Sequence, residues 1–131
     1  MRLLMIAAVS ALAIAGGADA RPGQSGEVEL AKLLQGRVAG QPTSCIRTYP
    51  SDTVRTIDRT ALVFGRGDTI YVNRTRSPDS LDEDDALVTR KFGSGTSLCQ
   101  TDLITKFDRN ARFYSGNVFL TDFVPYKRVR R

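Results

Sequence analysis

Two short β-prone segments joined by a glycine-rich loop constrain the fold of this chain more than any other feature. Residues 60–64 read TALVF, residues 69–73 read TIYVN, and residues 65–68 between them read GRGD. β-branched and aromatic residues favour extended backbone, whereas glycine and aspartate favour tight turns. The pattern therefore predicts a β-hairpin with a four-residue loop.

Further strands are predicted on both sides of this hairpin. Residues 45–46 and 54–57 are β-prone and are separated by a turn at Pro50. Residues 112–124 form a final apolar and aromatic strand, which we expect to be bulged at Ser115-Gly116 because glycine inside a strand often marks a bulge.

Residues 98–107 alternate between apolar and polar side chains, which predicts one more strand. In a continuous strand, successive side chains point to opposite faces. Cys99, Leu103 and Phe107 would then share one face.

Two short helices are predicted. Residues 27–36 have apolar positions at helical spacing and end at Gly36. In residues 81–91, acids come first and bases last, as the helix dipole favours, and Ser80 with Glu83 fits a capping box.

Together these segments predict a mainly β fold, with α+β as the alternative. We expect a small antiparallel sheet or a partly closed barrel, with a short N-terminal helix and one helical insertion. The predicted organisation is a signal peptide at residues 1–20, a lead-in with the short helix at 21–43, a single β-rich domain at 44–126 and a basic tail at 127–131.

The first twenty residues have the layout of a secretory signal peptide. Arg2 precedes an apolar run at residues 3–15, and Ala18-Asp19-Ala20 places small residues where a signal peptidase cleaves. A transmembrane helix needs about 20 apolar residues, so none is predicted. We expect an exported protein, periplasmic or secreted, that begins at Arg21.

Cys45 and Cys99 are the only cysteines. Disulfides persist in export compartments, so a single bond between them is predicted, and it would close a loop of about 55 residues. The alternative is a reactive thiol, which needs a setting that lowers the thiol pKa.

The composition excludes several classes of enzyme and metal protein. The chain of 131 residues has a net charge of +5 and contains no histidine. It therefore cannot carry a Ser–His–Asp or Cys–His catalytic centre, and two cysteines cannot form a four-ligand zinc site. Hydrolysis by a pair of carboxylates remains open, with Asp58, Asp68, Asp102 and Asp108 as candidates.

Two charged clusters are candidate binding sites. Asp82, Asp84 and Asp85 are weak candidates for Ca²⁺, because carboxylates are its ligands but the EF-hand order is absent. No metal site and no cofactor are predicted. The candidate anion-binding residues are the tail cations Lys127, Arg128, Arg130 and Arg131. No aromatic stacking platform with interleaved basic residues is evident, so specific binding of a nucleic acid is not expected.

Several segments in order resemble a family of small exported proteobacterial proteins of unknown function, over about residues 44–126. The segments are 44–46 (SCI), 60–64, 69–73, 98–104 (LCQTDLI) and 122–126 (DFVPY). Members of that family often carry further cysteines, in regions that here read Arg76-Ser77-Pro78-Asp79 and Tyr114-Ser115-Gly116-Asn117. Because these are missing, Cys45 and Cys99 could each descend from a different bridge. The resemblance implies compartment and fold, and no activity.

The sequence therefore predicts an exported protein that is a non-catalytic binding or structural module of the cell envelope. The alternative is a small carboxylate-dependent hydrolase. The expected partner is an envelope protein or an anionic polymer or surface, and a monomer is expected.

Overall fold

The computed structural model describes residues 23–93 and 95–130, so the predicted signal peptide, its cleavage site and Arg131 lie outside the described residues. The elements in chain order are α1 (Gln24–Leu33), β1 (Arg37–Ala39), β2 (Cys45–Arg47), β3 (Val54–Ile57), β4 (Ala61–Phe64), β5 (Thr69–Asn73), a 3₁₀ turn (Pro78–Ser80), β6 (Asp85–Arg90), β7 (Ser97–Cys99), β8 (Leu103–Asp108), β9 (Tyr114–Phe119) and β10 (Val124–Arg128).

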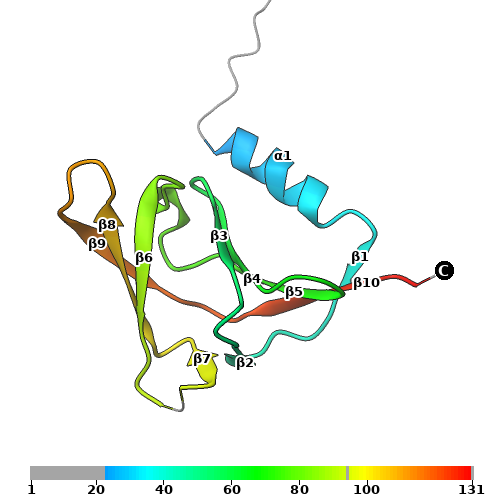
Figure 1. Cartoon of the computed structure of the whole chain (residues 1–131). Helices are drawn as coiled ribbons and strands as arrows, with labels where there is room; N and C mark the ends of the chain where they lie inside the picture. The colour runs from blue at the N-terminus through cyan, green and yellow to red at the C-terminus, as the bar shows by residue number, and fades with distance from the viewer. Residues whose placement is uncertain (1–22, 94, 131) are drawn as a thin grey trace, which may run out of the picture.

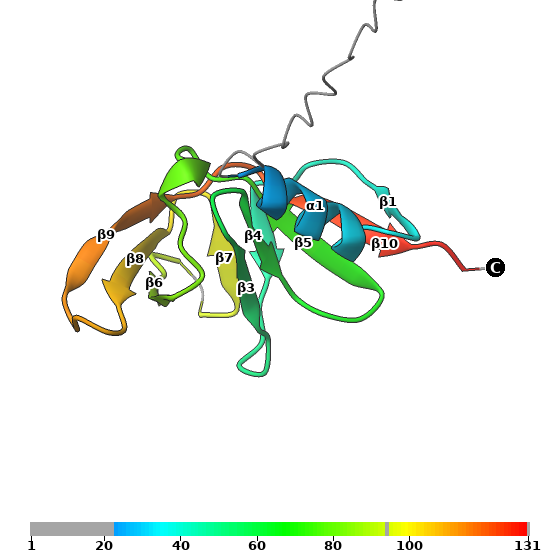
Figure 2. The same ribbon diagram turned by 90° about the horizontal axis from the view of Figure 1, so that it is seen from above.

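The predicted mainly β fold is confirmed, but the strands form three antiparallel sheets instead of one. A five-stranded sheet has the order β1-β10-β5-β4-β3, a three-stranded sheet has the order β6-β8-β9, and β2 pairs with β7. Figures 1 and 2 show α1 and the five-stranded sheet at one end of the molecule, β6, β8 and β9 at the other, and β2 and β7 between them. The predicted hairpin is the β4–β5 pair, in which Val63 lies opposite Val72.

Strand β4, which lies between β5 and β3, is buried on both faces, which explains its continuous apolar run. Ala61 and Val63 face α1 and pack in a cluster with Leu30 of the helix. Leu62 and Phe64 face the other way, into a cluster shared with β2, β7, β8 and β9. The protein thus has a core on each side of its main sheet.

The predicted helix at residues 81–91 is wrong. Residues 85–90 form β6, which pairs with β8 over six residues. The Ser80 hydroxyl donates to the Ser77 carbonyl and does not cap a helix. Leu81 is 2 % exposed, and it anchors this segment in the core. Pairing with β8 and burial of Leu81 therefore outweigh the local charge pattern, because propensity is weak against tertiary contacts.

The N-terminal helix is confirmed, although it begins at Gln24 and not at residue 27. It is fixed to the main sheet by its apolar side and by an ion pair of 2.5 Å between Glu27 and Arg74. The following strand β1 pairs with β10. The predicted lead-in is therefore an integral part of the folded unit.

The strand predicted at residues 98–107 is interrupted between β7 and β8. Asp102 causes the break, because its carboxylate accepts backbone hydrogen bonds from Phe92 and Cys99, both at 2.8 Å. The buried side chains of β8 are Ile104 and Lys106, whereas Phe107 is 36 % exposed. Leu103 and Phe107 share one face of β8 as predicted, but the interruption places Cys99 in a different sheet, so the prediction is wrong for Cys99.

The last predicted strand also divides, into β9 and β10. The predicted bulge is confirmed, because Lys106 lies opposite Gly116 while Phe107 lies opposite Tyr114. After β9 the chain crosses to the main sheet, and the Asn73 side chain fixes this crossing through hydrogen bonds to Thr121.

The predicted disulfide is confirmed. Cys45 and Cys99 are bonded and lie opposite each other in the β2–β7 pair, with their Cα atoms 4.0 Å apart. This bond is consistent with an oxidising compartment. Along residues 23–93 and 95–130, no helix has the length and apolar composition needed to cross a membrane.

Candidate functional site: a pocket beside Lys91

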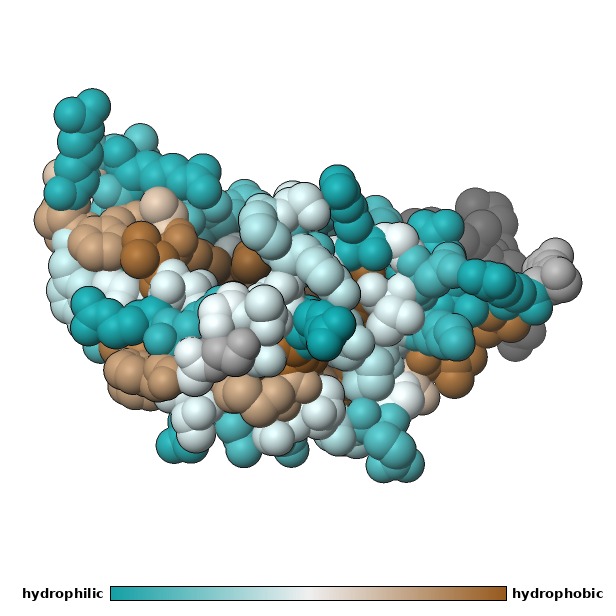
Figure 3. Space-filling model, turned by 60° about the horizontal axis from the view of Figure 1, so that its bottom comes forward, coloured by the Kyte–Doolittle hydropathy of each residue, from teal (hydrophilic) through white to brown (hydrophobic). Residues whose placement is uncertain are grey.

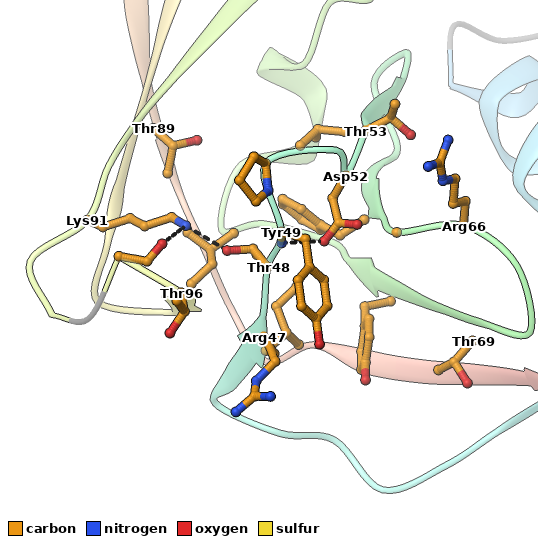
Figure 4. Close-up of a pocket in the computed structure, with 18 residues that line it drawn as sticks. Arg47, Thr48, Tyr49, Asp52, Thr53, Arg66, Thr69, Thr89, Lys91 and Thr96 are labelled. Carbon is orange, nitrogen blue, oxygen red and sulfur yellow. Dashed lines mark hydrogen bonds between the residues drawn. The ribbon is translucent and has the colours of Figure 1, made fainter.

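A pocket of about 510 Å³ opens where the three sheets meet. Its walls come from β2 and the loop after it, the adjoining ends of β4 and β5, the end of β6, and the loop before β7. We call it the Lys91 pocket, and Figure 4 shows its lining side chains. Its volume is typical of sites for small ligands.

The floor of the pocket is apolar and rigidly held. Ile46 and Leu98 lie opposite each other in the β2–β7 pair, next to the disulfide, and both are buried. Phe64 and half-buried Tyr71 complete the floor from the main sheet. These side chains belong to the larger core cluster, so the pocket floor is an extension of the protein interior.

Lys91 stands at one wall of the pocket, and its ammonium group is held by neutral oxygens. Nζ donates to the Thr48 hydroxyl at 2.6 Å and to the Gly95 carbonyl at 2.9 Å (Figure 4). An ammonium group has three donors and these contacts use two of them. Within the described residues, no carboxylate lies within 4.0 Å of this ammonium group. The Lys91 ammonium group therefore has a third hydrogen-bond donor that these two contacts do not use, and it contacts no carboxylate among the described residues.

The loops that carry this wall are tied together. The Thr48 amide donates to the Thr96 carbonyl at 2.9 Å, which joins the loop after β2 to the loop before β7. The Asp52 carboxylate accepts the Tyr49 amide at 2.7 Å and closes the turn between β2 and β3. The position of the Lys91 ammonium group is thus set by side-chain and main-chain contacts from both loops.

The charge balance of the pocket lining is positive. Arg47, Arg66 and Lys91 are the cations and Asp52 is the acid among the described lining residues. Figure 4 shows these cations around the pocket from three different directions. An apolar floor below an excess of cations suits a ligand with an apolar body and a negatively charged group.

No protein-family model, curated protein or solved structure matches this chain. The function must therefore be argued from the site.

The structure brings two of the four carboxylates considered for hydrolysis into one cavity and places the other two elsewhere. Asp58 and Asp108 line one acidic cavity of about 430 Å³ between the 3₁₀ turn and β8. Asp102 is buried and accepts the two backbone hydrogen bonds described above. Asp68 lies in the β4–β5 loop and pairs with Arg130 at 2.5 Å.

The weak calcium candidates Asp82, Asp84 and Asp85 line the same acidic cavity, and the carboxylates of Asp82 and Asp85 accept other contacts. Asp82 accepts the Asp84 amide at 2.8 Å. Asp85 is buried and pairs with buried Lys106 at 3.2 Å, and Ser115 donates to it. In the parts of the chain that the structure describes, no three acidic or cysteine side chains form a group that could hold a metal ion.

Three of the candidate anion-binding cations, Lys127, Arg128 and Arg130, lie in the main sheet or contact its loop and do not form a separate tail. Lys127 and Arg128 belong to β10, where Lys127 lies opposite Thr69. Arg130 donates a hydrogen bond to Asp68, and this bond and its charge hold the pKa of the Asp68 carboxyl below its ordinary value. The boundary predicted at residue 127 is therefore displaced, and Arg131 lies outside the described residues.

Sequence reasoning missed Lys91, because it assigned this residue to the end of a helix. One signal was available. The predicted disulfide brings residues beside Cys45 close to residues beside Cys99, and Thr48 and Thr96 are both within three residues of these cysteines. The approach of Lys91 to this junction depends on β6, which the sequence did not reveal.

Proposed function

We propose that this protein is an exported, non-catalytic binding module that holds a small amphipathic anion in the Lys91 pocket. The observation that carries the proposal is the Lys91 ammonium group, which is fixed by two neutral oxygens above an apolar floor. A carboxylate on the ligand would accept the third donor, and its alkyl body would cover Ile46, Phe64 and Leu98. A hydrogen bond between charged groups contributes about 1.5–3 kcal/mol.

Several features support the remaining parts of the proposal. The predicted signal peptide, the disulfide and the resemblance of residues 44–126 to small exported proteins all favour an exported compartment. Asp52 is the carboxylate among the described residues that line the pocket, and its side chain closes the turn between β2 and β3. A pair of carboxylates across a cleft, which glycoside hydrolysis requires, is not built there.

Three probes with the same alkyl chain and different head groups test the ligand class. Decanoate, decanol and decylamine share an apolar tail but carry a negative, a neutral and a positive group. We expect decanoate to bind most tightly and decylamine most weakly, as measured by calorimetry and by the rise in melting temperature. Equal binding of the three, or no binding of decanoate, would contradict the proposal.

The variant Lys91→Met removes the charge and keeps most of the apolar stem. We expect it to weaken decanoate binding at least about tenfold and to leave decanol binding nearly unchanged. The matched control is Lys32→Met on the exposed side of α1, which should change neither. A decanoate affinity that is insensitive to Lys91→Met would place the ligand elsewhere.

The hydrolase alternative has its support in the acidic cavity, where Asp58 and Asp108 are brought together. Hydrolysis of a glycan by the purified protein that is lost in both Asp58→Asn and Asp108→Asn would favour it over the binding module. Unchanged decanoate binding in these variants would show that the two sites are independent.

A further inference from the structure

The three-stranded sheet has one face on the core, and no element of the described residues covers its other face. Ile104, Lys106 and Val118 are buried and point inward. Because side chains alternate along a strand, Leu103, Thr105 and Phe107 of β8 point outward. Their register partners on the neighbouring strands therefore point outward too.

Five of the outward register positions carry large apolar side chains, and the polar pair of Thr105 and Asn117 lies between them. Leu103 lies opposite Phe119, Phe107 lies opposite Tyr114, and Val88 lies opposite Thr105. We call Val88, Leu103, Phe107, Tyr114 and Phe119 the outer apolar face. Val88, Tyr114 and Phe119 are each more than half exposed, at 54 %, 54 % and 55 %. The rings of Phe107 and Tyr114 contact each other edge to face, with centroids 6.3 Å apart.

Exposed apolar side chains that are contiguous on a sheet mark an interaction surface, whereas scattered ones do not. Figure 3 shows hydrophobic atoms gathered at the end of the molecule formed by β6, β8 and β9, with hydrophilic side chains next to them. Phe113, in the turn between β8 and β9, is a further large apolar side chain that is 57 % exposed.

The outward register positions carry an arginine, while the acids Asp82, Glu83 and Asp84 that precede β6 line the acidic cavity beside inward-pointing Lys106. Arg90 lies opposite Leu103 and is the charged residue among the outward register positions. Arg112 is exposed in the turn beside Phe113. The acids of these strands, Asp85 and Asp108, lie opposite each other at an inward register position. The outward positions of the described strands therefore combine aromatic and aliphatic side chains with arginine and include no carboxylate.

We propose that the outer apolar face docks the protein onto an anionic lipid bilayer surface. Phenylalanine, tyrosine and aliphatic side chains enter the boundary between headgroups and acyl chains. Arginine at the border donates to lipid phosphate in a bidentate geometry. Because no carboxylate occupies an outward register position of the described strands, the face itself does not repel an anionic surface, and its arginine complements the negative charge of a lipid headgroup.

This face is remote from the cations that the sequence analysis considered for anion binding. Figure 1 places β8 and β9 at one end of the molecule and the C-terminal end of β10 at the other. Lys127 and Arg128 are both exposed on β10. Replacing these two residues therefore removes two positive charges at the end of the molecule opposite the outer apolar face, which serves as the control for replacing two arginines near that face.

Co-sedimentation of the exported protein with phosphatidylcholine vesicles, with and without one quarter phosphatidylglycerol, tests the docking. We expect binding to the anionic vesicles. The double variant Val88→Ser/Phe119→Ser should lower the partition coefficient about tenfold or more, because both side chains lose apolar contact with the bilayer. Arg90→Gln/Arg112→Gln should lower binding to the anionic vesicles by about fivefold per arginine and leave binding to neutral vesicles unchanged.

The control variant Lys127→Gln/Arg128→Gln should bind like the parent protein. Circular dichroism and melting temperature of each variant establish that the fold is intact, and the arginine pair is an independent test if the serine pair does not fold. The proposal is overturned if the parent protein does not bind anionic vesicles, or if the control variant loses binding while the face variants keep it. It is also overturned if light scattering shows a dimer that Val88→Ser/Phe119→Ser dissociates, because the face would then bind a second copy of this chain.

Discussion

Removal of the disulfide by Cys45→Ala/Cys99→Ala should cost about 4 kcal/mol of unfolding free energy. The bond joins residues separated by 54 positions. In the chain-entropy model, a loop of this length loses about 14 cal/mol/K on closure, which is about 4 kcal/mol at 25 °C. A domain of this size has about 5–15 kcal/mol in total, so the double variant would lose a large share of its stability.

The same variant should also loosen the Lys91 pocket. The β2–β7 pair contains three residue pairs, and Ile46 opposite Leu98 is the middle one. A two-stranded pair this short is not stable alone in water. Without the covalent bond, the strands that carry half of the pocket floor should open locally, and we expect decanoate to bind more weakly than the loss of global stability explains.

Urea unfolding followed by circular dichroism measures the first effect, and calorimetry with decanoate measures the second. The melting temperature should fall by about 15 °C, at roughly 4 °C per kcal/mol for a domain near 100 residues. Ser97→Ala, in the same strand as Cys99, is the control and should change little. A loss below about 1 kcal/mol would refute the loop-entropy argument.

Two further predictions concern α1 and the C-terminal end. Gly26→Ala should destabilise the protein by about 1–3 kcal/mol in urea unfolding, because a Cβ at this position would collide with the Thr60 hydroxyl and the Asp58 carbonyl. This loss is expected although alanine favours a helix over glycine by about 1 kcal/mol. A more stable variant would show that α1 can shift. In a carbon-detected NMR titration, the pKa of the Asp68 carboxyl should lie below its ordinary value and should return to that value in Arg130→Gln. The ion pair therefore stabilises the fold at pH values above the ordinary carboxyl pKa, and this stabilisation is lost as the pH falls through the lowered pKa. Identical titrations of the two proteins would show that the pair does not form in solution.

The local pattern of the sequence determined much of the strand content. The β4–β5 hairpin, the bulge at Ser115-Gly116 and the N-terminal helix depend on side-chain alternation, on glycine and on helical spacing, which act over a few residues. The disulfide followed from the number of cysteines and the expected compartment. These features need no knowledge of distant contacts.

The errors occurred where distant segments compete with local preference. Residues 81–91 carry the charge order of a helix, yet residues 85–90 form β6, because pairing with β8 satisfies six residues and burial of Leu81 fixes the entry. Lys127 and Arg128 have the composition of a solvated end, yet they extend a strand between β1 and β5. Local composition does not predict which distant strands will pair.

The tertiary structure alone decided both surfaces to which we assign a function. Lys91, Thr48 and Gly95 meet because the β2–β7 pair and the end of β6 converge. The outer apolar face exists because the register of β8 with its neighbours turns Phe107 and Phe119 to solvent. A shift of one residue in that register would exchange the buried and exposed faces, and register is set by the packing of the inward face against the rest of the core, which no short segment of sequence encodes.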